Sequence, residues 1–144
     1  MRTVRDILRE KGTAVYSILP DATVYDALKM MADRNVGALI VLDGDRMVGK
    51  ISERNYARRV ILKHKLSTET AVREIMNVDV VTVTQNTNLD KCMELITEYR
   101  VRHLPVVEKD RVVGIISIGD IIKGIIGHKE NIIAQLEGYI KGWR

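Results

Sequence analysis

Residues 39–52 read LIVLDGDRMVGKIS, and residues 104–117 read LPVVEKDRVVGIIS. At an offset of 65 positions the two stretches share Leu, Val, Asp-Arg, Val-Gly and Ile-Ser in the same order. Each stretch has two apolar runs that flank a short polar turn, which is the pattern of a β-hairpin. The sequence therefore contains the same hairpin twice, and this internal repeat decides the fold class.

The repeat extends on both sides of the hairpins. Before each hairpin the same offset aligns two sets of apolar residues spaced i, i+3, i+4 and i+7, which is the spacing of an amphipathic helix. Thr23 with Asp26, and Asn88 in the second copy, supply the polar side chains that begin such helices. The aligned apolar residues are Val24, Ala27, Leu28 and Met31 in the first copy and Leu89, Cys92, Met93 and Ile96 in the second.

Each copy is predicted to follow one order of elements: a short helix, a strand, the amphipathic helix, two strands and a closing helix. The first copy has these at 4–11, 15–18, 38–42, 46–51 and 53–64 around its amphipathic helix, and the second at 71–76, 80–84, 103–107, 111–116 and from 118 onward. This order predicts an α+β fold of two pseudo-symmetric repeats, each a small sheet packed with helices.

The predicted boundaries are 1–66 for repeat 1, 67–126 for repeat 2 and 127–144 for a C-terminal helical extension. About sixty residues bury too little surface to be stable alone. We therefore expect the two halves to pack sheet against sheet as one module, with two equivalent clefts at their junction.

Composition narrows the class of protein. The chain has 144 residues, of which 46% are hydrophobic and 29% charged, so it has enough apolar residues for a core. No apolar run is long enough to span a bilayer, and the first residues lack the apolar stretch of a signal peptide. One cysteine excludes an internal disulfide, and three scattered histidines argue against a metal site. A cytoplasmic protein that does not bind membranes is expected.

The net charge of +4 raises the question of nucleic-acid binding. Basic and acidic residues are interleaved, however, and the chain has no Phe and one Trp, so it offers no aromatic ladder for stacking bases. A mixed, solvated surface explains the charge better, and a mildly basic balance also suits an anion-binding cleft.

The repeat resembles the CBS-domain family, and the whole chain resembles a stand-alone tandem pair of CBS domains, called a Bateman module. The second copy carries the signature in 101–107 (VRHLPVV) and 114–120 (GIISIGD), and the first in 36–41 (VGALIV) and 49–56 (GKISERNY). The resemblance covers roughly residues 4–125. It implies binding of AMP, ADP, ATP or NAD in the clefts between the copies, with occupancy transmitted as a conformational change.

Ser117 and Asp120 carry the strongest site prediction. They stand three residues apart where a strand becomes a helix, so the carboxylate can accept ribose hydroxyls while Ser117 and the helix N-terminus meet phosphate. The alternative is that they only cap the helix. By the family's cross-cleft arrangement, the primary nucleotide site comprises Tyr16, Ser17, Ile18, Gly37, Ala38, His103, Ile116, Ser117, Gly119 and Asp120.

A second, pseudo-symmetric site departs from the family pattern, because Asn55 stands where the ribose aspartate is expected. An amide loses a charge-assisted hydrogen bond, so this site is expected to bind more weakly or to be empty. Arg54, Arg102 and His103 are its candidate phosphate contacts, and surface charges are the alternative for the two arginines. The residues assigned to it are Ser52, Arg54, Asn55, Thr82, Val83, Arg102, His103 and Leu104.

The leading functional hypothesis is a non-catalytic energy-sensing module that binds an adenine nucleotide and regulates a separate partner protein. A nucleotide-processing enzyme is disfavoured because no nucleophile–base pair, metal cluster or phosphate-binding loop motif is visible. Two further hypotheses stay open: a dimerisation or scaffold module with a vestigial cleft, and a nucleic-acid-binding protein.

Two further expectations concern packing. Cys92 occupies a small position on the helical core stripe, so a buried, unreactive thiol is expected. A C-terminal apolar stripe is expected to pack on the domain or on a second copy, and a homodimer is the preferred assembly. Its members are Ile132, Ile133, Leu136, Tyr139 and Ile140.

Overall fold

The computed structural model describes residues 2–126 and 137–141, which divide into two compact units. One unit is continuous in sequence and comprises Val15–Val80; we call it the continuous unit. The other joins Met1–Ala14 to Val81–Arg144, and we call it the split unit. Each has its own apolar core, and the α+β class with two repeats is confirmed.

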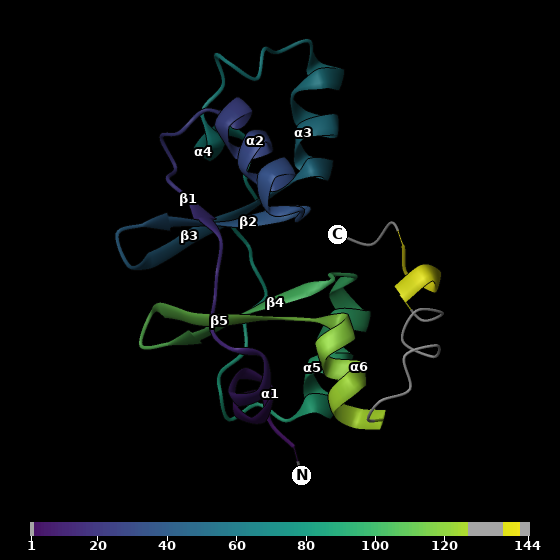
Figure 1. Ribbon diagram of the computed structural model, residues 1–144. Coiled ribbons are helices and arrows are strands. Elements are labelled where there is room, and N and C mark those ends of the chain that lie inside the picture. Colours follow the sequence, from purple (N-terminus) through teal and green to yellow (C-terminus); the bar gives the residue numbers. More distant parts are fainter. Residues whose placement is uncertain (1, 127–136, 142–144) are drawn as a thin grey trace. The chain divides into compact units, whose positions relative to one another are not determined.

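The continuous unit is built on three strands. Parallel pairing joins β1 to β2, with Ser17 opposite Ile40, and an antiparallel hairpin joins β2 to β3. The helices of this unit lie on one side of its strands (Figure 1). Its elements are β1 (Ser17–Ile18), α2 (Val24–Arg34), β2 (Ala38–Asp43), β3 (Arg46–Ser52), α3 (Glu53–Arg59), the 3-10 helix η1 (Ile61–Lys63) and α4 (Val72–Ile75).

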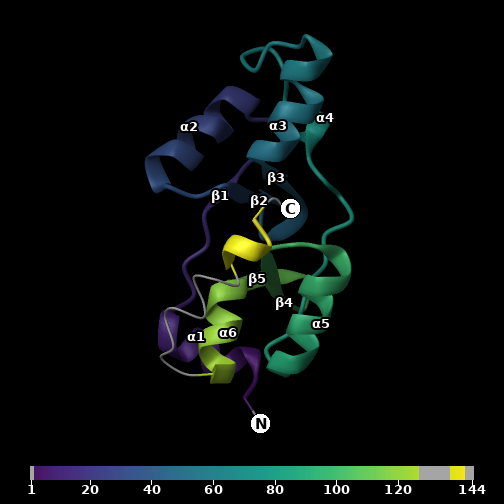
Figure 2. The same ribbon diagram turned by 90° about the vertical axis from the view of Figure 1, so that its right-hand side faces the viewer.

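The split unit has the corresponding antiparallel hairpin, formed by β4 and β5, with His103 opposite Ser117. Helices of this unit lie on one side of its hairpin in Figure 1, and Figure 2 shows the same arrangement from a second direction. Its elements are α1 (Val4–Lys11), α5 (Leu89–Tyr99), β4 (His103–Glu108), β5 (Arg111–Ser117) and α6 (Ile118–Ile126).

The two repeats also share details of their backbone conformation. Both amphipathic helices end on a residue with left-handed φ, Asn35 at 55° and Arg100 at 53°. Both hairpins carry a register shift, between Val41 and Leu42 in one and at the equivalent position of β4 in the other. The side chains of Thr23 and Asn88 accept hydrogen bonds from the backbone three residues on, as expected for helix caps.

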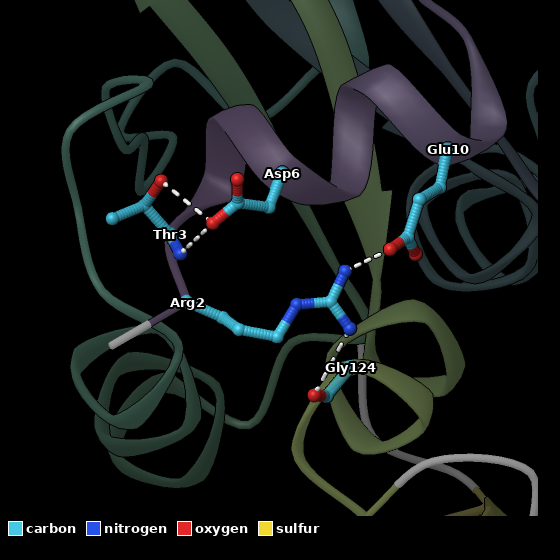
Figure 3. A network of polar contacts seen from close by, with 5 residues as sticks. All are labelled: Arg2, Thr3, Asp6, Glu10 and Gly124. Carbon is cyan, nitrogen blue, oxygen red and sulfur yellow. Dashed lines mark hydrogen bonds and ion pairs between the residues drawn. The ribbon is translucent and has the colours of Figure 1, made fainter.

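The short N-terminal helices do not pack with their own sequence repeats. Helix α1 packs against β5 and α6 of the split unit, although it precedes repeat 1 in the sequence, and α4 packs against α3 and β3 of the continuous unit. The start of α1 is fastened by Arg2, whose guanidinium pairs with Glu10 and donates to the Gly124 carbonyl at 3.3 Å (Figure 3). The compact units therefore differ from the predicted boundary at residues 66 and 67 by an exchange of helices.

Three element predictions need correction. The predicted strand at 80–84 is wrong: this segment makes one isolated parallel bridge, Val83 to Val106, within an otherwise irregular path. The strand predicted at 15–18 is reduced to Ser17–Ile18. The closing helix predicted at 53–64 ends at Arg59, where β-branched Val60 leaves the helical path before η1 begins.

The C-terminal stripe is described only in part. Ile140 is buried in the core of the split unit, whereas the Tyr139 side chain is 89% exposed. Ile132, Ile133 and Leu136 lie outside the described residues. Among residues 2–126 and 137–141, no helix has the length and apolarity needed to cross a bilayer.

Cys92 lies on α5 in the core of the split unit with no exposed surface. Burial raises the pKa of its thiol to about 11, because the thiolate would lose its hydration there. We expect iodoacetamide at pH 8 to label native Cys92 at least about 10-fold more slowly than the same chain in denaturing urea, since the thiolate is the reacting form. Equal labelling rates, measured by intact mass, would contradict this burial.

Candidate functional site

Ser117 and Asp120 form a reciprocal hydrogen-bonded pair at the junction of β5 and α6. The Ser117 backbone N–H donates to Asp120 Oδ2 at 2.8 Å, and the Asp120 N–H donates to Ser117 Oγ at 3.1 Å. This is a capping box, which satisfies two backbone donors at the start of α6. The Asp120 side chain is nevertheless 26% exposed, so one geometry serves the cap and leaves the carboxylate open to solvent.

Lys11 adds a cation to this pair. Its Nζ lies 2.7 Å from Asp120 Oδ2 and donates to the Ile115 carbonyl at 2.9 Å. Lys11 is the last residue of α1, so the packing of α1 against β5 brings the ammonium to a carboxylate 109 residues away in the sequence. The result is a carboxylate–ammonium pair at the N-terminus of α6.

Gly119, which the sequence assigns to the primary site, is closely approached by a side chain of the same protein. A Cβ atom at Gly119 would lie 2.5 Å from Oε1 of Glu137. Arg102, predicted as a phosphate contact, donates to the Glu137 carbonyl at 3.4 Å. The Glu137 side chain thus lies at Gly119 near the start of α6, and Arg102 holds the backbone of the same glutamate.

Ser52 and Asn55 repeat the geometry in the continuous unit. The Ser52 N–H donates to Asn55 Oδ1 at 2.9 Å, and the Asn55 N–H donates to Ser52 Oγ at 3.2 Å. Asn55 is only 5% exposed, whereas Asp120 is open to solvent. The residue that departs from the family pattern is therefore also the less accessible one.

One half of this box, a backbone N–H that donates to a carboxylate three residues on, recurs where no ligand was predicted. At the start of α1 the Thr3 N–H donates to Asp6 Oδ2 at 2.9 Å, and this bond lowers the pKa of the Asp6 carboxyl. At the start of α4 the Ala71 N–H donates to Glu74 Oε2 at 2.7 Å. The capping role considered as the alternative for Ser117 and Asp120 is therefore real, and ligand binding would be an additional role.

Other predicted residues of the split unit lie around its hairpin. His103 pairs with Ser117 and Leu104 with Ile116 across the two strands, so these four residues are brought together. The Arg102 carbonyl accepts the N–H of Ile118 at 2.9 Å, beside the cap. Val83 is buried under β4, and Thr82 is exposed.

The remaining predicted residues belong to the continuous unit. Ala38 pairs with Ser52, and the Gly37 carbonyl accepts the N–H of Glu53 at 3.0 Å, so these residues gather at the start of α3. Arg54 is the second residue of this helix and is half-buried. Ser17 and Ile18 form β1, which runs beside β2.

Tyr16 precedes β1, and its ring is 43% exposed. The Arg34 guanidinium lies 5.2 Å from the centroid of this ring, a cation–π contact that fixes one face of the tyrosine. The members of each predicted site are thus divided between the two units, and each group is ordered within its own unit.

No group of three or more His, Cys, Asp or Glu side chains within the described residues could hold a metal ion. Sequence inspection missed Lys11, Arg34 and Glu137 as neighbours of the predicted site. Their contacts depend on tertiary packing, and none stands in a local motif that would have signalled it.

A family model described as the CBS domain matches this chain twice, over residues 4–61 and 72–127. The chain belongs to the CBS-domain family. It has a tandem pair of CBS domains. One relative is the mitochondrial CBS domain-containing protein CBSX3 of Arabidopsis thaliana, 34% identical over 97% of this chain and 72% of its own length.

Two solved structures are informative. A putative signal-transduction protein with CBS domains from Burkholderia ambifaria is 44% identical, with a TM-score of 0.83 over 89% of this chain and 96% of that one. The CBS domain pair of protein MJ0100 is 25% identical, with a TM-score of 0.76 over 90% of this chain and 99% of that one. The MJ0100 pair was solved in complex with 5′-methylthioadenosine and S-adenosyl-L-methionine.

Proposed function

We propose that this CBS pair is a non-catalytic regulatory module that binds an adenosine-containing ligand, AMP, ADP, ATP or NAD, and signals its presence to a separate partner protein. The observation that carries the proposal is the solvent-open carboxylate of Asp120, held by Ser117 at the N-terminus of α6. A ribose diol offers two O–H donors to such an acceptor. The adenosine ligands of MJ0100 supply a precedent within the same family.

The primary ligand site in this proposal uses Asp120, and Asn55 contributes a weaker one. Asp120 keeps a negative charge that strengthens hydrogen bonds from hydroxyl groups. Asn55 has its Oδ1 already engaged by Ser52 and is nearly inaccessible. Asp120 thus differs from Asn55 in its charge and in its greater exposure, and both differences favour the Asp120 site.

The test is isothermal titration of the chain with AMP, ADP, ATP and NAD, repeated on Asp120→Ala. We expect the substitution to weaken binding of the best ligand by about 10–100-fold, the effect of losing a charged hydrogen-bonding partner. Glu74→Ala is the matched control, since it removes a capping carboxylate from α4, a helix with no residue assigned to a ligand site. The control variant should bind the best ligand with the same affinity as the unchanged chain.

Each contrary result has a defined meaning. If none of the four nucleotides binds, the chain is a dimerisation or scaffold module with a vestigial cleft. Binding that survives Asp120→Ala would transfer the ligand site to Asn55. Binding of nucleic acid that falls steeply with added salt would replace the proposal with a nucleic-acid-binding function.

The proposal includes a homodimer as the assembled form. Its sequence support is reduced because Ile140 is buried within its own unit. Sedimentation equilibrium of the full chain, with and without AMP, measures this directly, and a monomer at both conditions would remove the dimer from the proposal.

A further inference from the structure

Lys11 has no part in the predicted site, yet it makes a close ion pair with the proposed ribose carboxylate. Its Nζ lies 2.7 Å from Asp120 Oδ2, and the two side chains are 34% and 26% exposed. The pair is therefore reachable from solvent without being loosely held, because the Ile115 carbonyl accepts a second hydrogen bond from the same ammonium.

The donors and acceptors of this pair can be counted. Asp120 Oδ2 accepts from the Ser117 N–H and from Lys11, which occupy the two lone pairs of that oxygen. The hydrogen bonds of this carboxylate within residues 2–126 and 137–141 all go to Oδ2, so Oδ1 is left as an acceptor. Within the same described residues, Lys11 uses two of its three N–H donors, on Asp120 and Ile115, and one donor is left.

An acceptor beside a donor is the complement of a hydroxyl group, which donates one hydrogen bond and accepts others. Oδ1 of Asp120 can take the proton of a ribose hydroxyl while the remaining N–H of Lys11 donates to its oxygen. Resting on the proposed function, we propose that Lys11 is a specificity-determining residue that selects adenosine ligands with an intact ribose diol over deoxyribose analogues.

The charge of Lys11 also bears on the strength of this contact. The ammonium partly neutralises Asp120, so the carboxylate adds little net repulsion toward a ligand phosphate. A ligand that lacks the hydroxyl leaves both Asp120 Oδ1 and the remaining Lys11 N–H without a hydrogen-bond partner. Sites built to hydrogen-bond a hydroxyl discriminate strongly against ligands that lack it for this reason.

The experiment titrates AMP and 2′,3′-dideoxy-AMP into the unchanged chain, Lys11→Met, Lys11→Arg and Lys91→Met. The two ligands carry the same phosphate charge, so the ratio of their affinities removes long-range electrostatic effects. We expect AMP to bind the unchanged chain at least about 30-fold more tightly than the dideoxy analogue. Lys11→Met should reduce that ratio by about 10-fold, almost entirely through weaker AMP binding.

The two other variants act as controls. Lys91→Met removes the same charge from an exposed position on α5 that pairs with Glu94, and its ratio should be unchanged. Lys11→Arg keeps charge and donors, and its ratio should stay within about 3-fold of the unchanged chain. Thermal unfolding of all variants verifies that each is folded at the titration temperature.

An unchanged ratio in folded Lys11→Met, or tighter AMP binding by it, overturns the role of Lys11. The second result would mean that the ammonium competes with the ligand for Asp120. If AMP binding is lost in Asp120→Ala while the Lys11→Met ratio is unchanged, only the inference about Lys11 fails. If the unchanged chain binds neither ligand, nor any of the other nucleotides, the proposed function fails as well.

Discussion

A chain that begins at residue 12 should lose the folded structure of the split unit. Helix α1 inserts Val4, Ile7 and Leu8 into that core, where they are 0%, 3% and 5% exposed. Burying each such side chain contributes about 1.5–3 kcal/mol, so removing the helix costs about 5–9 kcal/mol. That loss is comparable with the whole stability of a typical domain, about 5–15 kcal/mol.

Two-dimensional amide NMR of the shortened chain measures the outcome residue by residue. Signals from 81–126 should collapse toward random-coil positions, because the core of the split unit loses Val4, Ile7 and Leu8, whereas the core of the continuous unit contains no residue of α1. Arg9→Ala, on the exposed side of α1, is the matched control and should change the free energy of unfolding by less than about 0.5 kcal/mol. Dispersed signals throughout 81–126 in the shortened chain would show that α1 is dispensable.

The helical and strand periodicities explain why so much of each unit could be predicted from sequence. The hairpins at 38–52 and 103–117 follow from pairs of apolar runs that flank polar turns, and both register and capping repeat between the copies. The failed strand at 80–84 shows the limit of this reasoning. Its β-branched residues favour extended backbone, but whether a second strand pairs along them is a tertiary property.

The exchange of helices could not be predicted for a related reason. Residues 4–8 and 72–76 are equivalent in the repeat, and local periodicity indicates a helix at each without stating which hairpin it covers. The same exchange brings Lys11 to Asp120. Ser117 and Asp120 were found from sequence because they are three residues apart, whereas Lys11 became visible only through packing.

Gly49 on β3 and Gly114 on β5 lie where the exchanged helices and the residues after them pack against the two hairpins. The two glycines are equivalent in the repeat. Residues 76 and 77, after α4, pack closely against Gly49, and Leu8 of α1 packs closely against Gly114. A Cβ atom at Gly49 would lie 2.6 Å from Met76 Sδ and 2.8 Å from the Asn77 carbonyl oxygen. At Gly114 it would lie 2.7 Å from Leu8 Cδ2, the far end of a flexible side chain.

We therefore expect Gly49→Ala to destabilise the protein more than Gly114→Ala. The Asn77 carbonyl is held by reciprocal backbone hydrogen bonds with Lys50, each 2.9 Å, so it cannot move aside without breaking the bridge. Overpacking against it should cost about 3 kcal/mol, the upper end for such changes, whereas a rotation of Leu8 should limit the cost at Gly114 to about 1 kcal/mol.

Urea unfolding of both variants gives these free energies directly, and Gly138→Ala is a control because no atom in the part of the chain that the structure describes lies within 4 Å of its added methyl group. Equal destabilisation at Gly49 and Gly114 would mean that the Asn77 backbone yields as easily as a side chain. A larger cost at Gly49 would identify the bridge between residues 50 and 77 as the rigid seam of the continuous unit. The segment after α4 would then be fixed to β3 by its backbone, whereas α1 is fixed to β5 through the Leu8 side chain and the hydrogen bond from Lys11 Nζ to the Ile115 carbonyl.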